Sequence, residues 1–446
     1  MAKHFDLVLE GGTVVSHAGK HVCDIGVVRG QIAALGQLKQ SVSAEVINCT
    51  GLHILPGVID THVHFREPGA LQKEDLASGS LSAVMGGVTA FFEMPNTTPP
   101  TTSAEALASK VAIGTDRAFC DFAFYVGATL ENIEELGHLE RLPGCCGIKV
   151  FMGASTGTLL VESDEGIAAV LRQANRRVAF HSEDEERLRR RVSQQREGDP
   201  SSHSQWRDAE AALLGTRRLL KLASEAGKRI HVLHVTTSEE MQLLALHKAV
   251  ATVEVTPQHL TLTSPEAYDR LGTRAQMNPP LRDETHAAGL WLGTAQGVAD
   301  TIGSDHAPHT LEEKAKSYPL SPSGMPGVQT LVPIMLDHVN AGRLSLESFV
   351  DLTAHGPQRV FGIANKGRIA VGYDADFTIV DLKMQRLIED KWIASRCGWT
   401  PFAGRLVTGW PVGTVVRGQR VVWEDQLLLA EGAGKPVRFS EALHSA

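Results

Sequence analysis

Five side chains able to bind a metal stand at the ends of short apolar segments of the sequence. They are His62, His64, His181, His234 and Asp305. His62 and His64 share one face if their segment is a strand, because alternate residues of a strand point to the same side. A single histidine in such a place is more often a hydrogen-bonded core residue than a ligand. Five candidates at equivalent places favour a metal centre, and imidazole with carboxylate suits zinc or another first-row metal.

A lysine lies inside another apolar segment, residues 147–152, where a charge is costly. Burial lowers the pKa of a lysine, so the neutral amine of Lys149 becomes accessible. A neutral amine can add CO₂, and the resulting carbamate can bridge two metal ions. The alternative is that Lys149 extends towards solvent or pairs with a carboxylate. A ligand role requires the carbamate, because a bare ammonium would repel the metals.

The elements that must position these residues alternate between apolar runs and helical stretches. Strand-helix alternation predicts a parallel sheet, and eight repeats over roughly 250 residues predict a (β/α)₈ barrel, class α/β. The strand ends that carry the candidate ligands would then meet at one face. The clearest helical stripe, within 206–226, comprises Trp206, Ala209, Leu213, Leu220 and Ala223. The eight predicted strand segments are 55–65, 89–96, 121–128, 147–153, 177–183, 229–236, 251–257 and 299–307.

Both ends of the chain read instead as short strands separated by glycine turns. Residues 5–15 and 24–36 show this pattern, and it returns in 367–382 and 408–426. Each end is too short to bury a core alone, so we expect one small composite β-sandwich domain built from both. The predicted division is 1–53 for the N-terminal part of the β domain, 54–364 for the barrel, and 365–446 for the C-terminal part and tail.

Composition narrows the class of partner. The 446 residues carry a formal net charge of −8 and only 5% are aromatic, which argues against binding of nucleic acid. No apolar run is long enough to span a membrane, and Asp6 and Glu10 interrupt any secretory leader. The six cysteines form no C-x-x-C pair, so reduced thiols in the cytoplasm are expected.

Several motifs together resemble the amidohydrolase superfamily, and within it dihydroorotases and their close relatives. They are H-V-H-F-R-E-P-G from residue 62, M-P-N-T from 94, G-I-K-V-F-M-G from 147, M-N-P-P-L-R from 277 and S-D-H-A-P-H-T from 304. The resemblance covers nearly the whole chain. It is highly specific for the superfamily and less so for the substrate.

The resemblance implies two zinc ions per subunit, bridged by carboxylated Lys149 and a hydroxide. His62, His64 and Asp305 would bind one zinc, and His181 and His234 the other. The hydroxide would attack the carbonyl of a cyclic amide, with Asp305 transferring its proton to the leaving nitrogen. The implied reaction is the reversible hydrolysis of L-dihydroorotate to N-carbamoyl-L-aspartate, a step of pyrimidine biosynthesis.

The resemblance also implies which residues bind the substrate. Arg66, Asn96 and His309 would hold its carboxylate, while Asn278 and the backbone of Gly327 would border its ring. Arg66, two residues after His64, has the forked geometry that suits a carboxylate. Two alternatives are a surface salt bridge of Arg66 with a neighbouring glutamate and a turn position for Asn96.

The loop after Lys149, residues 153–158, is small and polar and could form a mobile lid. Hydantoinases place a tyrosine five residues after the lysine, where this chain has Ala154, and this difference favours an anionic substrate. One rival function is hydrolysis of another cyclic ureide or imide, such as allantoin or a hydantoin. A second is an inactive relative that serves as a structural partner. We expect a homo-oligomer, a dimer or tetramer, that acts on a small molecule.

Overall fold

Eight parallel strands form the centre of the computed structural model, which describes residues 4–38, 42–155, 157, 159–429 and 432–440. Each strand of this sheet pairs with the next one along the chain, as predicted for a (β/α)₈ barrel. The strands are β8 (Val58–Val63), β9 (Val88–Glu93), β10 (Asp121–Gly127), β11 (Cys145–Phe151), β12 (Val178–His181), β13 (Ile230–Val232), β14 (Ala251–Val255) and β15 (Thr301–Ile302).

The sheet closes between its first strand and the segment that follows its last. Val63 forms a parallel bridge with His306, and the amide of His64 donates to the carbonyl of His306 at 2.7 Å. This closure brings the ends of the first and eighth strands together. It therefore places residues that are more than 240 positions apart in the sequence at one site.

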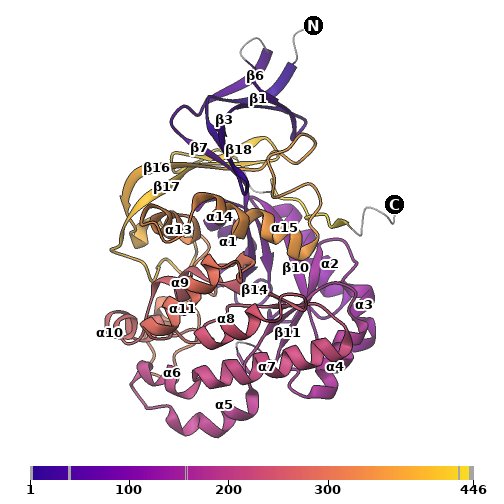
Figure 1. Cartoon of the computed structure of the whole chain (residues 1–446), viewed down its shortest axis with the longest axis vertical. Helices are drawn as coiled ribbons and strands as arrows, with labels where there is room; N and C mark the ends of the chain where they lie inside the picture. Colours follow the sequence, from indigo (N-terminus) through magenta and orange to yellow (C-terminus); the bar gives the residue numbers. More distant parts are fainter. Residues whose placement is uncertain (1–3, 39–41, 156, 158, 430–431, 441–446) are drawn as a thin grey trace.

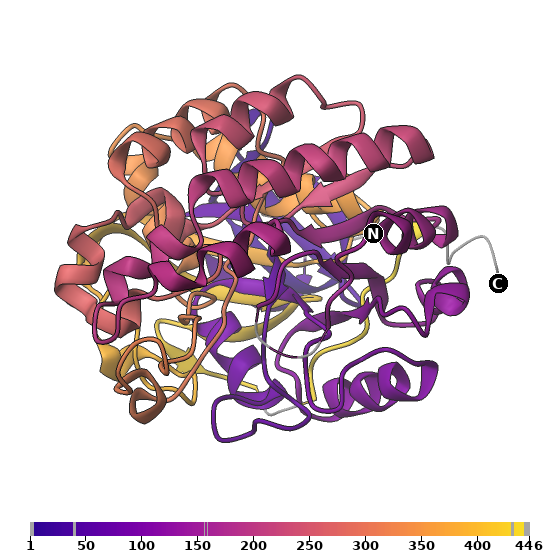
Figure 2. The same ribbon diagram turned by 90° about the horizontal axis from the view of Figure 1, so that it is seen from below.

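Helices surround the barrel, as the view from below shows (Figure 2). Those between the strands are α1 (Leu76–Met85), α2 (Ala104–Arg117), α3 (Leu136–Leu139), α4 (Asp164–Gln173), α5 (Glu185–Arg191), α6 (His203–Trp206), α7 (Ala209–Ala226), α8 (Ser238–Ala245), α9 (Pro257–Thr261), α10 (Glu266–Leu271) and α11 (Glu284–Ala295). After the last strand come α12 (Leu311–Lys314), α13 (Leu331–Asn340), α14 (Leu346–Val350) and α15 (Gly356–Phe361).

The predicted stripe on residues 206–226 is wrong in its start and its face. Asp208 accepts a hydrogen bond from the amide of Ala211 and thereby caps α7, so Trp206 belongs to the separate turn α6. Of the five predicted residues, only Leu220 and Ala223 are buried. The buried face of α7 comprises Ala211, Ala212, Gly215, Thr216, Leu219, Leu220, Leu222 and Ala223.

The two ends of the chain assemble a β domain beside the barrel, with its strands at the top of Figure 1. A seven-stranded sheet mixes both ends in the order β19-β18-β17-β16-β7-β2-β3, and β7 pairs directly with β16. Its strands are β2 (Thr13–Ser16), β3 (Gly19–Val22), β7 (His53–Pro56), β16 (Phe377–Leu387), β17 (Leu406–Val416), β18 (Gln419–Trp423) and β19 (Gln426–Leu427). A second sheet comprises β1 (His4–Glu10), β4 (Asp24–Val28), β5 (Gln31–Gly36) and β6 (Val42–Asn48). The composite domain predicted from the turn pattern is confirmed.

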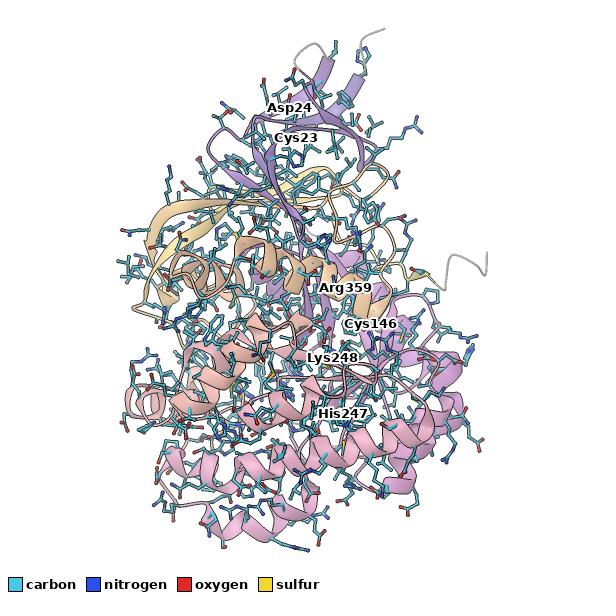
Figure 3. The ribbon with its side chains drawn as sticks, viewed as in Figure 1. Cys23, Asp24, Cys146, His247, Lys248 and Arg359 are labelled. Atoms are coloured by element: carbon cyan, nitrogen blue, oxygen red, sulfur yellow. The ribbon has the colours of Figure 1, made fainter. Side chains whose placement is uncertain are left out.

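All six cysteines are buried and form no disulfide. Cys23 lies in the β domain and Cys146 in the barrel, far apart in Figure 3. Burial raises the pKa of the Cys120 and Cys146 thiols, which keeps both protonated and unreactive. Among the described residues, no helix has the length and apolar character needed to cross a bilayer.

Candidate metal centre and substrate pocket

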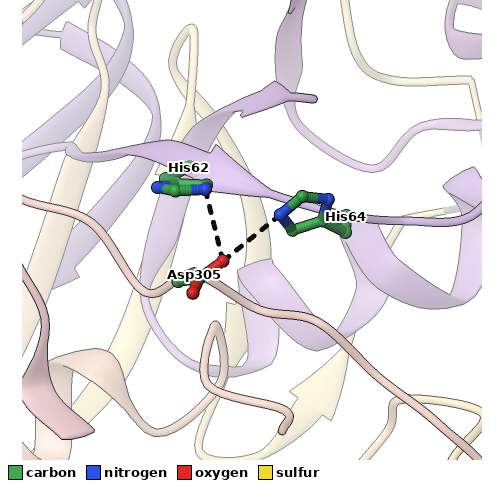
Figure 4. Close-up of side chains that lie close together, drawn as sticks. All are labelled: His62, His64 and Asp305. Carbon is green, nitrogen blue, oxygen red and sulfur yellow. Dashed lines mark ion pairs between the residues drawn. The ribbon is translucent and has the colours of Figure 1, made fainter. Parts of the chain in front are cut away.

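His62, His64 and Asp305 point at one another across the closure of the barrel (Figure 4). His62 lies in β8, His64 directly after it, and Asp305 three residues after β15. The Nε2 atoms of both histidines lie 3.2 Å from Oδ1 of Asp305. One ligand atom from each residue can be chosen so that all lie within 4.8 Å of one another. Three buried side chains thus present a common donor set that one cation can share.

His181 and His234 form a second pair beside the first. Nδ1 of His181 lies 3.0 Å from Nε2 of His234, and the ring of His234 lies 5.3 Å from that of His62. Nζ of Lys149 is buried and lies 4.5 Å above the ring of Phe151. The strand ends therefore bring all six predicted ligands to one pocket, as the lining residues confirm.

Two atoms of this cluster indicate that a further group belongs there. Nζ of Lys149 and Nδ1 of His234 are fully buried, yet neither has a hydrogen-bond partner among the described residues. Burial lowers the pKa of Lys149 to about 7, although Asp305 and Glu254 oppose that shift. Buried polar atoms are rarely left unpaired, so this donor set fits a metal.

Three residues of the site have a strained backbone. Arg66, His234 and Asp305 all adopt positive φ angles, of 64°, 38° and 43° respectively. Each such conformation costs on the order of 1–3 kcal/mol for a residue other than glycine and persists only where the surroundings impose it. Two candidate ligands and the predicted carboxylate-binding arginine are therefore held in conformations that the surrounding structure imposes.

Two buried glutamates, Glu183 and Glu254, orient the histidines, and neither was predicted from the sequence. Oε1 of Glu254 lies 2.7 Å from Nδ1 of His62, and Oε2 of Glu183 lies 2.8 Å from Nε2 of His181. Each hydrogen bond leaves the other ring nitrogen free to face the centre. A signal was present, because Glu254 interrupts an apolar strand just as Lys149 does.

Arg66 lies in the pocket without an ion pair. Its Nε donates to the carbonyl of Pro308 at 3.2 Å, its Nη2 lies 3.4 Å from Nε2 of His309, and no carboxylate in the described ranges lies within ion-pair distance. The alternative of a salt bridge with a neighbouring glutamate is not observed in those ranges. The guanidinium is 5% exposed, so it presents a buried positive charge to the cavity.

His309 is held between Arg66 and Lys73. Nζ of Lys73 lies 3.2 Å from its Nδ1, and its Nε2 lies 3.0 Å from the carbonyl oxygen of Ser323. Burial, together with the cations nearby, lowers the pKa of His309 to about 3, so the ring is neutral. Its Nε2–H is directed at Ser323, which leaves Arg66 as the principal cation of the pocket.

Of the three remaining residues predicted to contact the substrate, two line the pocket and Gly327 does not. Asn96 and Asn278 line the pocket, and His203, to which the sequence assigned no role, lies 2.9 Å from the Oδ1 atom of Asn278. Gly327 is absent from the pocket lining, and its amide donates to Nδ1 of His306 at 3.1 Å. Ser323 and Gly324 line the pocket, and we call them its wall.

The loop after Lys149 is anchored at its start. The amide of Ala154 donates to Glu185 at 2.6 Å, and its carbonyl accepts from Nη2 of Arg207 at 2.9 Å. Ser155, the next residue, lines the pocket. The predicted lid extends over Thr156 and Thr158, which lie outside the described residues.

A second group of acids, Asp121, Asp374 and Asp376, also has the spacing of a metal site. Lys366 occupies its centre, with Nζ 2.5 Å from Asp121 and 2.6 Å from Asp376. Arg417 pairs with Asp121 as well. These carboxylates are neutralised by the protein itself, so the group is a structural ion-pair network.

Comparison with known proteins agrees with this geometry. The amidohydrolase family model matches residues 53–421. A dihydroorotase of Halobacterium salinarum is 39% identical over 384 residues, 84% of this chain and 88% of the relative. An allantoinase of Rubrobacter xylanophilus is 35% identical over 450 residues, 97% of this chain and 98% of the relative.

The solved structure of an L-hydantoinase from Arthrobacter aurescens superposes with a TM-score of 0.94 at 31% identity, over 97% of this chain and 99% of that one. These relatives act on different cyclic amides, so they agree on the class of reaction and leave the substrate open. The family and its relatives imply a metal cofactor. The chain belongs to the amidohydrolase family and is a hydrolase of cyclic amides.

Proposed function

We propose that the chain is a binuclear zinc dihydroorotase, which hydrolyses L-dihydroorotate reversibly to N-carbamoyl-L-aspartate. The observation that carries this proposal is Arg66, a buried guanidinium in the pocket without a carboxylate partner among the described residues. A buried cation of this kind needs an anion, and dihydroorotate supplies a carboxylate. Such an enzyme would act in pyrimidine biosynthesis in the cytoplasm, and we expect a homo-oligomer.

The donor set supports two metal sites. His62, His64 and Asp305 would hold one zinc, His181 and His234 the other, and carboxylated Lys149 would bridge them. When bound, the metals would polarise the amide carbonyl and lower the pKa of water. Glu183 and Glu254 support this assignment, since both fix the tautomer of a ligand histidine.

In this proposal Asp305 moves the proton. Burial would raise the pKa of its carboxyl, but His62 and His64 outweigh burial and hold that pKa below its usual value. The carboxylate can therefore accept a proton from water as the water oxygen bonds to the carbonyl carbon. When the C–N bond breaks, the same proton passes to the leaving nitrogen.

The substrate would lie between Arg66 and the wall formed by Asn278, Ser323 and Gly324. Arg66 would bind the carboxylate through its forked N–H groups, with Asn96 and His309 beside it. Asn278 would face the ring, and its own amide is oriented by His203. Ala154 offers no hydroxyl to the ring, and this agrees with the choice of an anionic substrate.

The second candidate is hydrolysis of a neutral ureide, favoured by the allantoinase relative that covers 97% of the chain. A panel of L-dihydroorotate, allantoin, hydantoin and a cyclic imide, assayed with zinc and bicarbonate, separates the two. We expect dihydroorotate to be turned over with the highest kcat/KM. Turnover of allantoin alone would establish the second candidate instead.

A third possibility is an inactive structural relative. Metal analysis of protein purified without chelator tests it, because the complete ligand set predicts about two zinc per chain. A content well below one zinc per chain, with no turnover of any substrate in the panel, would favour the inactive relative.

A further inference from the structure

Lys314, the last residue of α12, is a buried cation that the reaction does not use. It is 1% exposed, and no carboxylate in the described part of the chain pairs with it. Burial lowers the pKa of its ammonium to about 7, so the protein retains this group at a cost. Its three hydrogen bonds compensate that cost, since Nζ donates to the carbonyls of Gln276 at 3.0 Å, Pro322 at 2.8 Å and Gly324 at 3.0 Å.

These three acceptors come from two separate segments, and each segment leads into the pocket. Gln276 lies two residues before Asn278, which lines the pocket. The other segment forms the pocket wall at Ser323 and Gly324. Gly324 is part of this wall, and Pro322 directly precedes it. One ammonium therefore joins two stretches of backbone that lead into the pocket which Arg66 also lines.

A second tie connects the same segments. The side chain of Gln276 donates to the carbonyl of Ser321 and to Oγ of Ser323, each at 3.0 Å, and accepts from Oγ of Ser321 at 2.7 Å. The amide of Gly324 also donates to the carbonyl of Gln276 at 2.9 Å. These hydrogen bonds thus fix the position of the two segments relative to each other.

Gly324 packs closely against Ala307 and His309, in the segment that follows β15. Gly324 has a φ of 137°, and a Cβ there would lie 2.5 Å from the carbonyl oxygen of Ala307 and 3.0 Å from Nε2 of His309. Movement of these carbonyls away from Lys314 would break its hydrogen bonds. The ammonium therefore holds in place two backbone segments that lead into the pocket which Arg66 also lines.

We infer that Lys314 is a positioning residue that sets the distance between the carboxylate-binding arginine and the wall against which the substrate ring lies. This inference rests on the proposed function for the identity of the ring. It assigns Lys314 to substrate binding through the backbone, without contact with the reacting atoms. A wall of this kind binds ground state and transition state alike, so its loss raises KM and leaves kcat nearly unchanged.

The test compares Lys314→Met with Lys316→Met in the zinc-loaded full-length enzyme. Lys316 is exposed and lies two residues further along the chain, after the end of α12, so its variant removes the same charge from the surface. For the substrate that the wild type turns over best, we expect Lys314→Met to raise KM about tenfold while kcat changes by less than about threefold. Zinc content should equal that of the wild type, and the amides of residues 321–325 should exchange hydrogen faster.

A KM within about twofold of wild type would overturn the inference, as would a fall in kcat accompanied by loss of zinc. If Lys314→Met does not fold, Ser321→Ala is the test variant. It removes the hydroxyl that donates to Oε1 of Gln276 and so weakens the second connection between the two segments. We expect a rise in KM of about threefold at unchanged kcat, and an unchanged KM would contradict the role of the wall. Failure of the wild type to act on dihydroorotate affects only the proposed function, since the comparison holds for any substrate of the panel.

Discussion

Glu183 lies beneath His181, with its Oε2 2.8 Å from Nε2 of the imidazole. The opposite nitrogen, Nδ1, faces His234 at 3.0 Å. Burial would raise the pKa of Glu183, but Arg207 and His181 outweigh it and hold the pKa far below its usual range. An ionised carboxylate therefore accepts the Nε2–H of His181 and fixes the tautomer whose Nδ1 lone pair points at the metal centre.

Replacing Glu183 by glutamine should weaken metal binding. The amide keeps the shape of the carboxylate but loses its charge, and Arg207 is left buried without a counter-ion. We expect zinc affinity to fall by about 10- to 100-fold in a competition with a chelator. Glu186→Gln, on the exposed side of α5, is the matched control and should retain wild-type affinity. Equal affinities for the two variants would show that Glu183 does not orient a ligand.

Lys149→Ala should remove the proposed bridge between the two proposed metal sites. Zinc content should fall below two per chain and turnover should be lost, because Nζ of Lys149, unpaired among the described residues, is the amine that would form the carbamate. Short carboxylic acids such as acetate or propionate should restore part of both, since they supply the missing carboxylate. Lys221→Ala, at an exposed site of α7, serves as the control. An unmodified Lys149 in a zinc-loaded crystal structure would contradict the assignment.

The barrel and the meeting of the candidate ligands in one pocket were predictable because their signal repeats. Each strand is a short apolar run, and His62, His181, His234 and Asp305 stand near the same end of their runs. A parallel barrel turns that repeated position into proximity. The composite β domain was predictable for a related reason, since neither end of the chain can bury a core alone.

The residues that support the site were less visible, because their roles arise from contacts between distant segments. His203 orients Asn278 across 75 positions of sequence, and Lys314 reaches carbonyls of two loops. The start of α7 was misplaced for a local reason, since the cap at Asp208 outweighs the apolar periodicity that continues through Trp206. Gly327 was expected to border the ring with its backbone; its amide donates to His306, and the expectation stays a prediction.

Arg66→Met should discriminate between anionic and neutral substrates. The variant keeps the aliphatic stem but removes the only guanidinium among the described residues that line the pocket. For dihydroorotate, kcat/KM should fall by about 30- to 1,000-fold, the loss expected for a charge-assisted pair of 2–4 kcal/mol. Hydrolysis of a neutral ureide, where measurable, should change much less. An equal loss for both substrates would indicate that Arg66 supports the site as a whole.

Asp305→Asn should separate metal binding from proton transfer. The amide oxygen can still face His62 and His64, but an amide cannot accept and return a proton. We expect much of the zinc to remain and kcat to fall by about 10²- to 10⁴-fold. In the wild type, kcat should fall at low pH as Asp305 is protonated. The absence of this fall in Asp305→Asn would support the same conclusion. Near-normal turnover would exclude Asp305 as the base.

The buried pair Glu93 and Lys110 predicts a pH dependence of stability. Nζ of Lys110 lies 2.5 Å from Oε2 of Glu93, and both side chains are almost fully buried. Burial raises the pKa of Glu93 from 4.5 to about 7, although Lys110 opposes the shift. A carboxyl whose pKa is higher in the folded state stabilises the protein below pH 4.5, and this contribution is lost as the pH rises to about 7.

Lys110→Met removes the opposing cation, so the pKa of Glu93 should rise further. The stabilisation by the protonated carboxyl should then be lost only at a higher pH. At pH 8 the variant must bury an unpaired carboxylate or protonate it, at a cost of about 3–5 kcal/mol. At pH 5.5 Glu93 is protonated in the folded variant, and the destabilisation should be smaller. Thermal midpoints at both pH values measure the difference. The double variant Glu93→Gln/Lys110→Met carries no titrating group at these two positions and should show no such pH dependence. An equal loss of stability in Lys110→Met at both pH values would mean that the pair is not coupled.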